Sequence, residues 1–296
     1  MEPSFWGGAA GRYLRRAQFE VWRSLEPRYP VHMQGRALTV PGAVPNASRL
    51  PASWPGNWKT QLFARLLDGR LGAFLDVGAN TGQTLLDHFS LNSQTHYLGF
   101  EPNPICAAIL KEIIRANALE DHAIVPVGLS DDNALVKLYV RGGKSADGSG
   151  TLMAQLRPHR TLEAHYAPCY RLDDIAGALG LGEIPLIKID VEGAELLALR
   201  GMRETVNAAR PWIVCEVLHR DADADAAAHA ARNAEILDLL ADLGYGAHRI
   251  LKPANESRLD GFMPITAFSN ETWTPNNKHE CDYLFAPREA EDQLTR

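Results

Sequence analysis

Polar residues that can bind a ligand or move a proton stand at the ends of five short apolar runs. These are Asp76 to Gly82, Glu101, Ser130 with Asp131, Asp190 to Glu192, and Glu216. In an open parallel α/β sheet a ligand binds beyond the carboxyl ends of the strands, where the strand order reverses. If the apolar runs are neighbouring strands, these residues meet around one site.

The first group, Asp76-Val77-Gly78-Ala79-Asn80-Thr81-Gly82, separates an apolar run from a helical stretch. Its two glycines let the backbone take positive φ and approach a ligand closely. Asn80 breaks the dinucleotide pattern G-x-G-x-x-G, and no Gly-Lys-Ser/Thr follows as in a P-loop. The turn, preceded by an acidic residue, therefore suits a ligand without phosphate groups. A purely topological role is the alternative.

Glu101 ends the second run, where an acidic side chain can accept hydrogen bonds from both ribose hydroxyls of an adenosine. Ser130 and Asp131 follow the third run, at a place suited to an acceptor for the adenine amino group. A simple turn explains the Ser130–Asp131 pair equally well. The glycine turn followed by Glu101 predicts an adenosine-containing ligand.

Three residues are candidates for acid–base or metal chemistry. Asp190 and Glu216 end runs that we expect to be neighbouring strands, which places two carboxylates at the cleft. His219 lies three residues further on, and its unperturbed pKa of ~6.5 suits a general base. The same three side chains could instead hold Mg²⁺ or another divalent cation, and His219 could be a surface residue. Glu192 is either a helix-dipole partner or a substrate contact.

The elements that must position these residues alternate between strand and helix. Strands are predicted at 73–77, 96–100, 123–127, 134–140, 185–190 and 212–217, with a final edge strand at 281–285; helices are predicted after Gly82, from Pro104 with Asn103 as N-cap, from Leu172, from Glu192 to a C-cap at Gly201, and over 226–243. This order predicts an α/β fold with a mainly parallel sheet, helices on both faces and an antiparallel last strand.

Three segments do not follow this alternation. Residues 1–60 predict a helix over 13–22 and then a proline-broken irregular arm, a candidate lid. Residues 61–296 then form the main domain. Within it, 141–168 and 250–280 are expected to be loops on the substrate side, the first because of its glycines and its length.

Composition narrows the class of protein. The chain has 296 residues, of which 46% are hydrophobic, and a net charge of −6, so nucleic acid is a poor candidate partner. Four scattered cysteines predict reduced thiols, and no apolar stretch approaches the ~20 residues that span a membrane. We expect a cytoplasmic protein; the sequence leaves its oligomeric state open.

Four motifs together resemble the FkbM family of methyltransferases. They are Phe74 to Gly82, Gly99-Phe100-Glu101-Pro102-Asn103-Pro104, Val127 to Asp131, and Leu186-Ile187-Lys188-Ile189-Asp190-Val191-Glu192-Gly193-Ala194-Glu195. The resemblance covers about residues 70–217 and implies the Rossmann-like class I methyltransferase fold with S-adenosylmethionine as cofactor. The residues that it implies for the cofactor are Asp76, Gly78, Asn80, Thr81, Gly82, Glu101, Pro102, Asn103, Ser130, Asp131 and Asp190.

The resemblance also implies a class of acceptor. Family members mostly methylate hydroxyls of sugars and polyketide-like natural products, and some relatives methylate a side-chain amide nitrogen in peptide natural products. An alcohol is a poor nucleophile at neutral pH, so O-methylation calls for a base or a metal. A nucleotide- or NAD-binding protein without methyl transfer is the competing hypothesis, and Asn80 counts against it.

Overall fold

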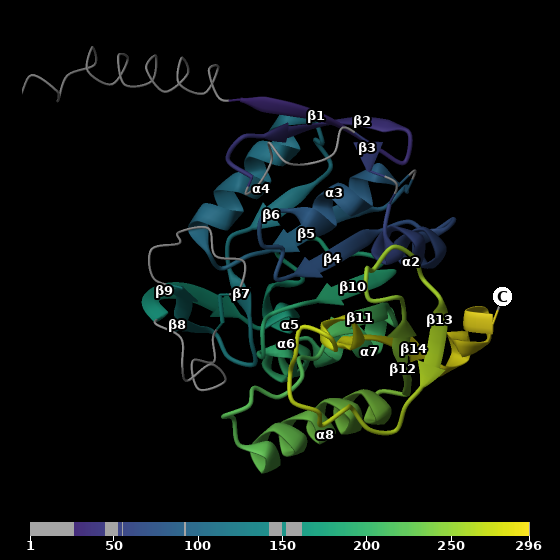
Figure 1. Ribbon diagram of the computed structural model, residues 1–296. Helices are drawn as coiled ribbons and strands as arrows, with labels where there is room; N and C mark the ends of the chain where they lie inside the picture. Colours follow the sequence, from purple (N-terminus) through teal and green to yellow (C-terminus); the bar gives the residue numbers. More distant parts are fainter. Residues whose placement is uncertain are drawn as a thin grey trace, which may run out of the picture.

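The computed structural model describes residues 27–44, 53–54, 56–91, 93–141, 150–151 and 162–295. Its centre is an eight-stranded sheet (Figure 1). In spatial order the strands are β13 (Gly261–Pro264), β12 (Tyr245–Leu251), β14 (Asp282–Pro287), β11 (Trp212–Glu216), β10 (Leu186–Ile189), β4 (Ala73–Val77), β5 (His96–Phe100) and β6 (Ala123–Val125). The five strands from β6 to β11 are parallel, and β14 runs antiparallel to both of its neighbours.

Helices cover both faces of this sheet (Figure 1). One layer holds α2 (Trp58–Leu67), α3 (Gln83–Ser90) and α4 (Pro104–Ala116); the other holds α5 (Leu172–Ile175), α6 (Glu195–Gly201), α7 (Arg203–Ala209) and α8 (Ala226–Asp242). Successive residues of β4 show why its run is continuously apolar, since Phe74 packs into the first layer and Leu75 into the second. The predicted mainly parallel α/β sheet is confirmed.

The N-terminal arm is not irregular throughout. Residues 28–41 form an antiparallel pair, β1 (Arg28–Met33) and β2 (Arg36–Pro41), and β3 (Ser53–Trp54) pairs parallel to β1. Val31, Met33, Leu38 and Val40 are buried against α3 and α4, so this small sheet shares the main core. The alternation of buried and exposed residues formed strands despite the prolines. The helix expected over 13–22 lies outside the described residues.

A second small sheet stands beside the carboxyl ends of the central strands. It contains β7 (Gly128–Leu129), β9 (Leu162–Tyr170) and β8 (Ala134–Arg141), with β8 and β9 antiparallel. The strand expected at 134–140 is therefore present but does not join the main sheet. The expected loop 141–168 was wrong from Leu162 onward; β9 contains Pro168 and is largely exposed, so it lacks the apolar alternation of a strand.

Smaller differences concern the C-terminal half. The last strand is antiparallel as expected, but β14 lies between β11 and β12 and is not an edge strand. Helix α6 begins at Glu195 and ends with Gly201, so its C-cap is Met202 and not Gly201. Glycine is needed at 201 for another reason, because a Cβ there would lie 1.9 Å from the Ser130 carbonyl oxygen. The 250–280 segment contains β13 and the 3₁₀ turn η3 (Lys278–Glu280), and the described chain ends in η4 (Arg288–Thr295).

Two further properties agree with the sequence. Cys106, Cys169, Cys215 and Cys281 are all buried free thiols. Within the described residues, the helices are too short or too polar to cross a bilayer.

Candidate active site

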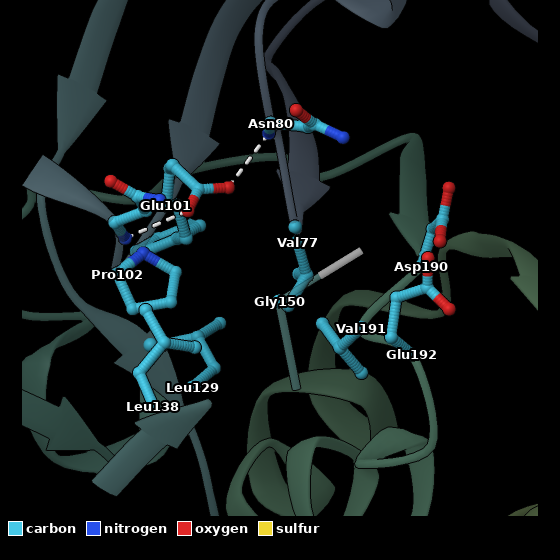
Figure 2. A pocket seen from close by; sticks show the side chains of 14 residues that line it. Val77, Asn80, Glu101, Pro102, Leu129, Leu138, Gly150, Asp190, Val191 and Glu192 are labelled. Carbon is cyan, nitrogen blue, oxygen red and sulfur yellow. Dashed lines mark hydrogen bonds between the residues drawn. The ribbon is translucent and has the colours of Figure 1, made fainter. Parts of the chain in front are cut away.

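A cleft opens at the carboxyl ends of β4, β5 and β10. Its volume is about 630 Å³ including the open mouth. Its lining comes from three loops and the second small sheet: Val77, Gly78, Asn80, Phe100, Glu101, Pro102, Asn103, Gly128, Leu129, Leu138, Gly150, Asp190, Val191 and Glu192. Figure 2 shows Glu101 and Pro102 on one side of the cleft and Asp190 and Glu192 on the other.

Glu101 joins the loops that follow β4 and β5. Its Oε2 accepts a hydrogen bond from the Asn80 backbone N–H at 2.7 Å, and its Oε1 accepts one from the Asn103 N–H at 2.7 Å (Figure 2). Burial raises the pKa of this carboxyl to about 7, against the opposing effect of the two N–H donors. A carboxylate has about four acceptor sites, so two remain for a ligand in the cleft.

The glycine turn explains its residue types locally. Gly78 has φ of 83°, and a Cβ there would lie 1.9 Å from the Asp190 carbonyl oxygen. Asn80 has φ of 51°, a left-handed conformation that asparagine tolerates better than most residues. Gly82 packs against α4, since a Cβ would lie 2.6 Å from Ile113 Cδ1. The turn therefore needs glycine at 78 for the close approach of the Asp190 backbone and glycine at 82 for packing against α4.

Lys188 of β10 links residues at the carboxyl ends of β4 and β10. Its ammonium lies 3.2 Å from Asp76 Oδ1 and 3.2 Å from Asp190 Oδ2, and it donates to the Gly78 carbonyl at 3.4 Å. Burial would lower the pKa of Lys188, but Asp190 and Asp76 raise it, so the cation is retained. Asp76 is fully buried and also accepts a hydrogen bond from the Tyr97 hydroxyl. Asp76 is thus part of the support and does not line the cleft.

Asp190 and Glu216 meet as expected from their neighbouring strands. The two carboxyl groups interact, and Asp190 lines the cleft with about a third of its side chain exposed. Burial would raise the pKa of Asp190, but Lys188 and Glu216 lower it. Burial and the charges of Asp190 and Asp282 raise the pKa of Glu216 well above its ordinary value. Asp190 is therefore ionised, and Glu216 holds the proton between them.

His219 does not join these carboxylates. It is 5% exposed, and its Nε2 lies 3.2 Å from the carbonyl oxygen of Asn277. It does not line the cleft. Nor do Asp190, Glu216 and His219 form a metal-binding group: the part of the chain that the structure describes contains no cluster of three His, Cys, Asp or Glu side chains suited to a metal ion.

The remaining predicted residues divide in the same way. Pro102 and Asn103 line the cleft, and Asn103 is the N-cap of α4 as expected. Thr81 is buried beside the cleft without lining it. Gly128 and Leu129 line the cleft where Ser130 and Asp131 were expected; Asp131 instead lies 3.8 Å from Arg200 in an exposed ion pair.

Several residues of the site had no individual prediction. Lys188 stood inside a quoted motif, yet its role needed the register that pairs it with Asp76. Asp282 lies opposite Glu216 because β14 is inserted beside β11, and it pairs with Lys252 at 2.5 Å. Glu192, by contrast, was predicted as a helix-dipole partner or a substrate contact; it lies in the loop before α6 with φ of 56°, and its carbonyl accepts a hydrogen bond from Thr151 at 2.8 Å. Of the residues without a prediction, only Asp282 had a signal in the sequence, as an acidic residue near the start of the predicted final strand.

The comparisons with known proteins agree on a methyltransferase domain. The model of the family described as "Methyltransferase FkbM domain" matches residues 76–246, more than half of the chain. The chain belongs to this family. It is 27% identical over 146 residues to 2-O-methyltransferase NoeI of Sinorhizobium fredii, covering 46% of this chain and 59% of that protein.

A second curated protein and a solved structure are also similar to the chain. Methyltransferase sdnD of Sordaria araneosa is 31% identical over 160 residues, covering 44% of this chain and 60% of that protein. The crystal structure of Methyltransferase FkbM from Methylobacillus flagellatus aligns with a TM-score of 0.44 and 16% identity over 72% of this chain and 43% of that chain. The chain thus spans less than two thirds of the length of NoeI and sdnD.

Proposed function

We propose that this FkbM-family protein transfers a methyl group from S-adenosylmethionine to a hydroxyl of a small-molecule acceptor, such as a sugar or another natural product. The observation that carries the proposal is the meeting of Glu101 with the Gly78–Gly82 turn at an open cleft. The relative NoeI is a 2-O-methyltransferase, which favours oxygen over nitrogen as the methylated atom.

The residues present fit the cofactor. Glu101 is oriented by two backbone N–H groups and keeps acceptor capacity for the ribose hydroxyls. Leu129, Leu138 and Pro102 supply apolar surface on the same side of the cleft for the adenine ring (Figure 2). No P-loop or G-x-G-x-x-G pattern is available for a phosphate. Asp190 on the opposite wall suits a positively charged group.

The cofactor, when bound, supplies a methyl group on a positively charged sulfur. Asp190 then has two tasks: it accepts a hydrogen bond from the acceptor hydroxyl, which orients the oxygen for in-line attack, and it takes the proton that the oxygen loses. An oxygen that has gained a methyl group while keeping its proton is a strong acid. A carboxylate of low pKa is therefore a sufficient base at that stage. The neighbouring Glu216, whose own pKa is raised, lowers the pKa of Asp190 and so favours its ionised form.

Calorimetric titration tests the cofactor half of the proposal. S-adenosylhomocysteine should bind, NAD should not, and Glu101→Ala should weaken S-adenosylhomocysteine binding by at least tenfold, because a hydrogen-bonded buried charge is worth roughly 1.5–3 kcal/mol. Glu120→Ala, at an exposed glutamate away from the cleft, serves as the matched control. Binding of NAD in preference to S-adenosylhomocysteine would refute the proposal.

A further inference from the structure

A second cleft lies between the N-terminal sheet and the helices α2 and α3. Its volume is about 880 Å³ including the open mouth. One wall is apolar and comes from Val31 and Met33 of β1, Val40 of β2 and Leu86 of α3. Three of these four residues precede the segment that matches the family model, so this wall is a feature of the chain's own N-terminal region.

The other wall carries charged and amide groups, and two of them, Asp87 and Lys59, lack strong partners among the described residues. Asp87 is 4% exposed, yet its only side-chain hydrogen bond among the described residues comes from Asn57 Nδ2 at 3.4 Å. Within the same part of the chain, no acceptor lies at hydrogen-bond or ion-pair distance from Lys59 Nζ. Buried polar groups in folded proteins are normally paired. Both side chains line the cleft, so a ligand there would supply the missing partners.

This cleft borders the proposed catalytic carboxylates. A chain of contacts connects them. The ring of Trp58, the residue before Lys59, lies 3.9 Å from Lys252 Nζ, and Lys252 contacts Asp282 at 2.5 Å. Asp282 in turn lies opposite Glu216 in the sheet. Burial lowers the pKa of Lys59, but the charge of Asp87, followed by those of Asp282 and Asp190, raises it.

The cleft also continues the glycine turn. Gln83 follows Gly82 directly and lines the second cleft, whereas Gly78 and Asn80 line the first. One turn and the start of the helix that follows it, α3, thus contribute residues to both clefts. A molecule in the second cleft would therefore lie beside the turn that lines the first.

We infer that this second cleft binds the methyl acceptor, with Lys59 and Asp87 as the residues that hold the acceptor's polar groups; the inference rests on the proposed function. The lining also defines the acceptor chemically. Among the described lining residues, two lysines, Lys59 and Lys278, balance two carboxylates, Asp87 and Glu256, so these four side chains carry no formal net charge. Its ligand is a neutral compound with hydroxyl or amide groups on one side and an apolar surface on the other.

Methionine methyl NMR tests this inference directly, because Met33 lies in the apolar wall. The full chain, labelled with ¹³C at the methionine methyl groups and saturated with S-adenosylhomocysteine, is titrated with 4-nitrophenyl β-D-glucoside. The Met33 signal, assigned with Met33→Leu, should shift. Met202 in the opposite core layer and Met263 on β13 should not. The matched anionic probe, 4-nitrophenyl β-D-glucuronide, should bind more weakly.

Two substitutions then test the polar wall. Asp87→Asn and Lys59→Gln should each weaken binding of the glucoside by roughly 10- to 100-fold, the effect of losing a hydrogen bond to a charged group. Neither should change the affinity for S-adenosylhomocysteine, and Glu120→Gln should change neither affinity. Lys59→Gln keeps the test informative if Asp87→Asn does not fold, because Lys59 is only half-buried on α2.

The outcomes separate the two proposals. An unmoved Met33 signal in a protein that binds S-adenosylhomocysteine overturns the acceptor cleft and leaves the proposed function standing. Unchanged glucoside affinity in both variants overturns the roles of Asp87 and Lys59, and tighter binding of the glucuronide overturns the neutral acceptor. Failure to bind S-adenosylhomocysteine counts against the proposed function itself.

Discussion

The pH dependence of cofactor binding follows from the surroundings of Glu101. The free protein holds this carboxyl with a pKa of about 7, because burial outweighs two backbone N–H donors. Ribose hydroxyls donate to an ionised carboxylate, so ligand binding favours the charged form. Affinity should therefore be low below pH 7, rise as the pH passes through 7, and become constant above about pH 8.

The magnitude follows from the fraction of free protein that is ionised. With a pKa of about 7, roughly one molecule in ten is ionised at pH 6 and about nine in ten at pH 8. If only the ionised form binds well, the dissociation constant of S-adenosylhomocysteine should fall about ninefold to tenfold between those values. This corresponds to ~1.3 kcal/mol, which calorimetry resolves.

Glu101→Gln isolates the effect of this one group. Glutamine does not titrate in this range. Its side-chain NH₂ group would face one of the two backbone N–H groups that donate to the Glu101 carboxylate in the natural protein, so one of these hydrogen bonds is lost. The variant should bind S-adenosylhomocysteine at least tenfold more weakly than the natural protein at pH 8, with the pH dependence removed. Ligand titration affects both proteins equally and cancels in the comparison. An identical pH profile in protein and variant would refute the assignment of Glu101 to the ribose.

Three substitutions test the rest of the site. Asp190→Asn should lower turnover by roughly 10²-fold or more while changing S-adenosylhomocysteine affinity less than about threefold; equal losses would make Asp190 a cofactor ligand only. Gly78→Ala should abolish cofactor binding in calorimetry, because its Cβ meets the Asp190 carbonyl at 1.9 Å, whereas Gly69→Ala, with open space around it, should not. Lys188→Met should cost roughly 3–5 kcal/mol in denaturant unfolding, and adding Asp76→Asn should recover part of that loss; no recovery would contradict the pairing.

How far the sequence predicted this arrangement depended on the kind of interaction. Glu101 and Asp190 were found because a parallel sheet brings the carboxyl ends of its strands to one edge, whatever the side chains do. Ser130 and Asp131 were misplaced because β7 leaves the main sheet and pairs with β9, which turns the following residues out of the cleft. Register decides which side chain lines a cleft, and strand-end position alone does not predict it.

The missed parts share a different cause. The pairing of Asp282 with Glu216 required β14 to lie between β11 and β12, a long-range choice that no local pattern specifies. The same holds for the N-terminal sheet, whose Val31 and Val40 meet the helices only through tertiary packing. Prolines and short runs there reduced the local signal for strands. Local periodicity thus predicted the elements, but not the order in which non-consecutive strands pair.

The two glutamates at this edge of the sheet show how one fold gives similar side chains different roles. Burial raises the pKa of both, but Glu101 is surrounded by backbone N–H groups and Glu216 by the carboxylates Asp190 and Asp282. The first therefore titrates near neutrality and can accept hydrogen bonds as an anion, whereas the second favours its protonated form beside Asp190. Lys188 completes the separation by holding Asp190 ionised. An ionised carboxylate held in place by a proton donor and a cation is too weak a base to deprotonate an alcohol before attack. It is sufficient for one that loses its proton as the new carbon–oxygen bond forms, and this timing is what a sulfonium methyl donor requires.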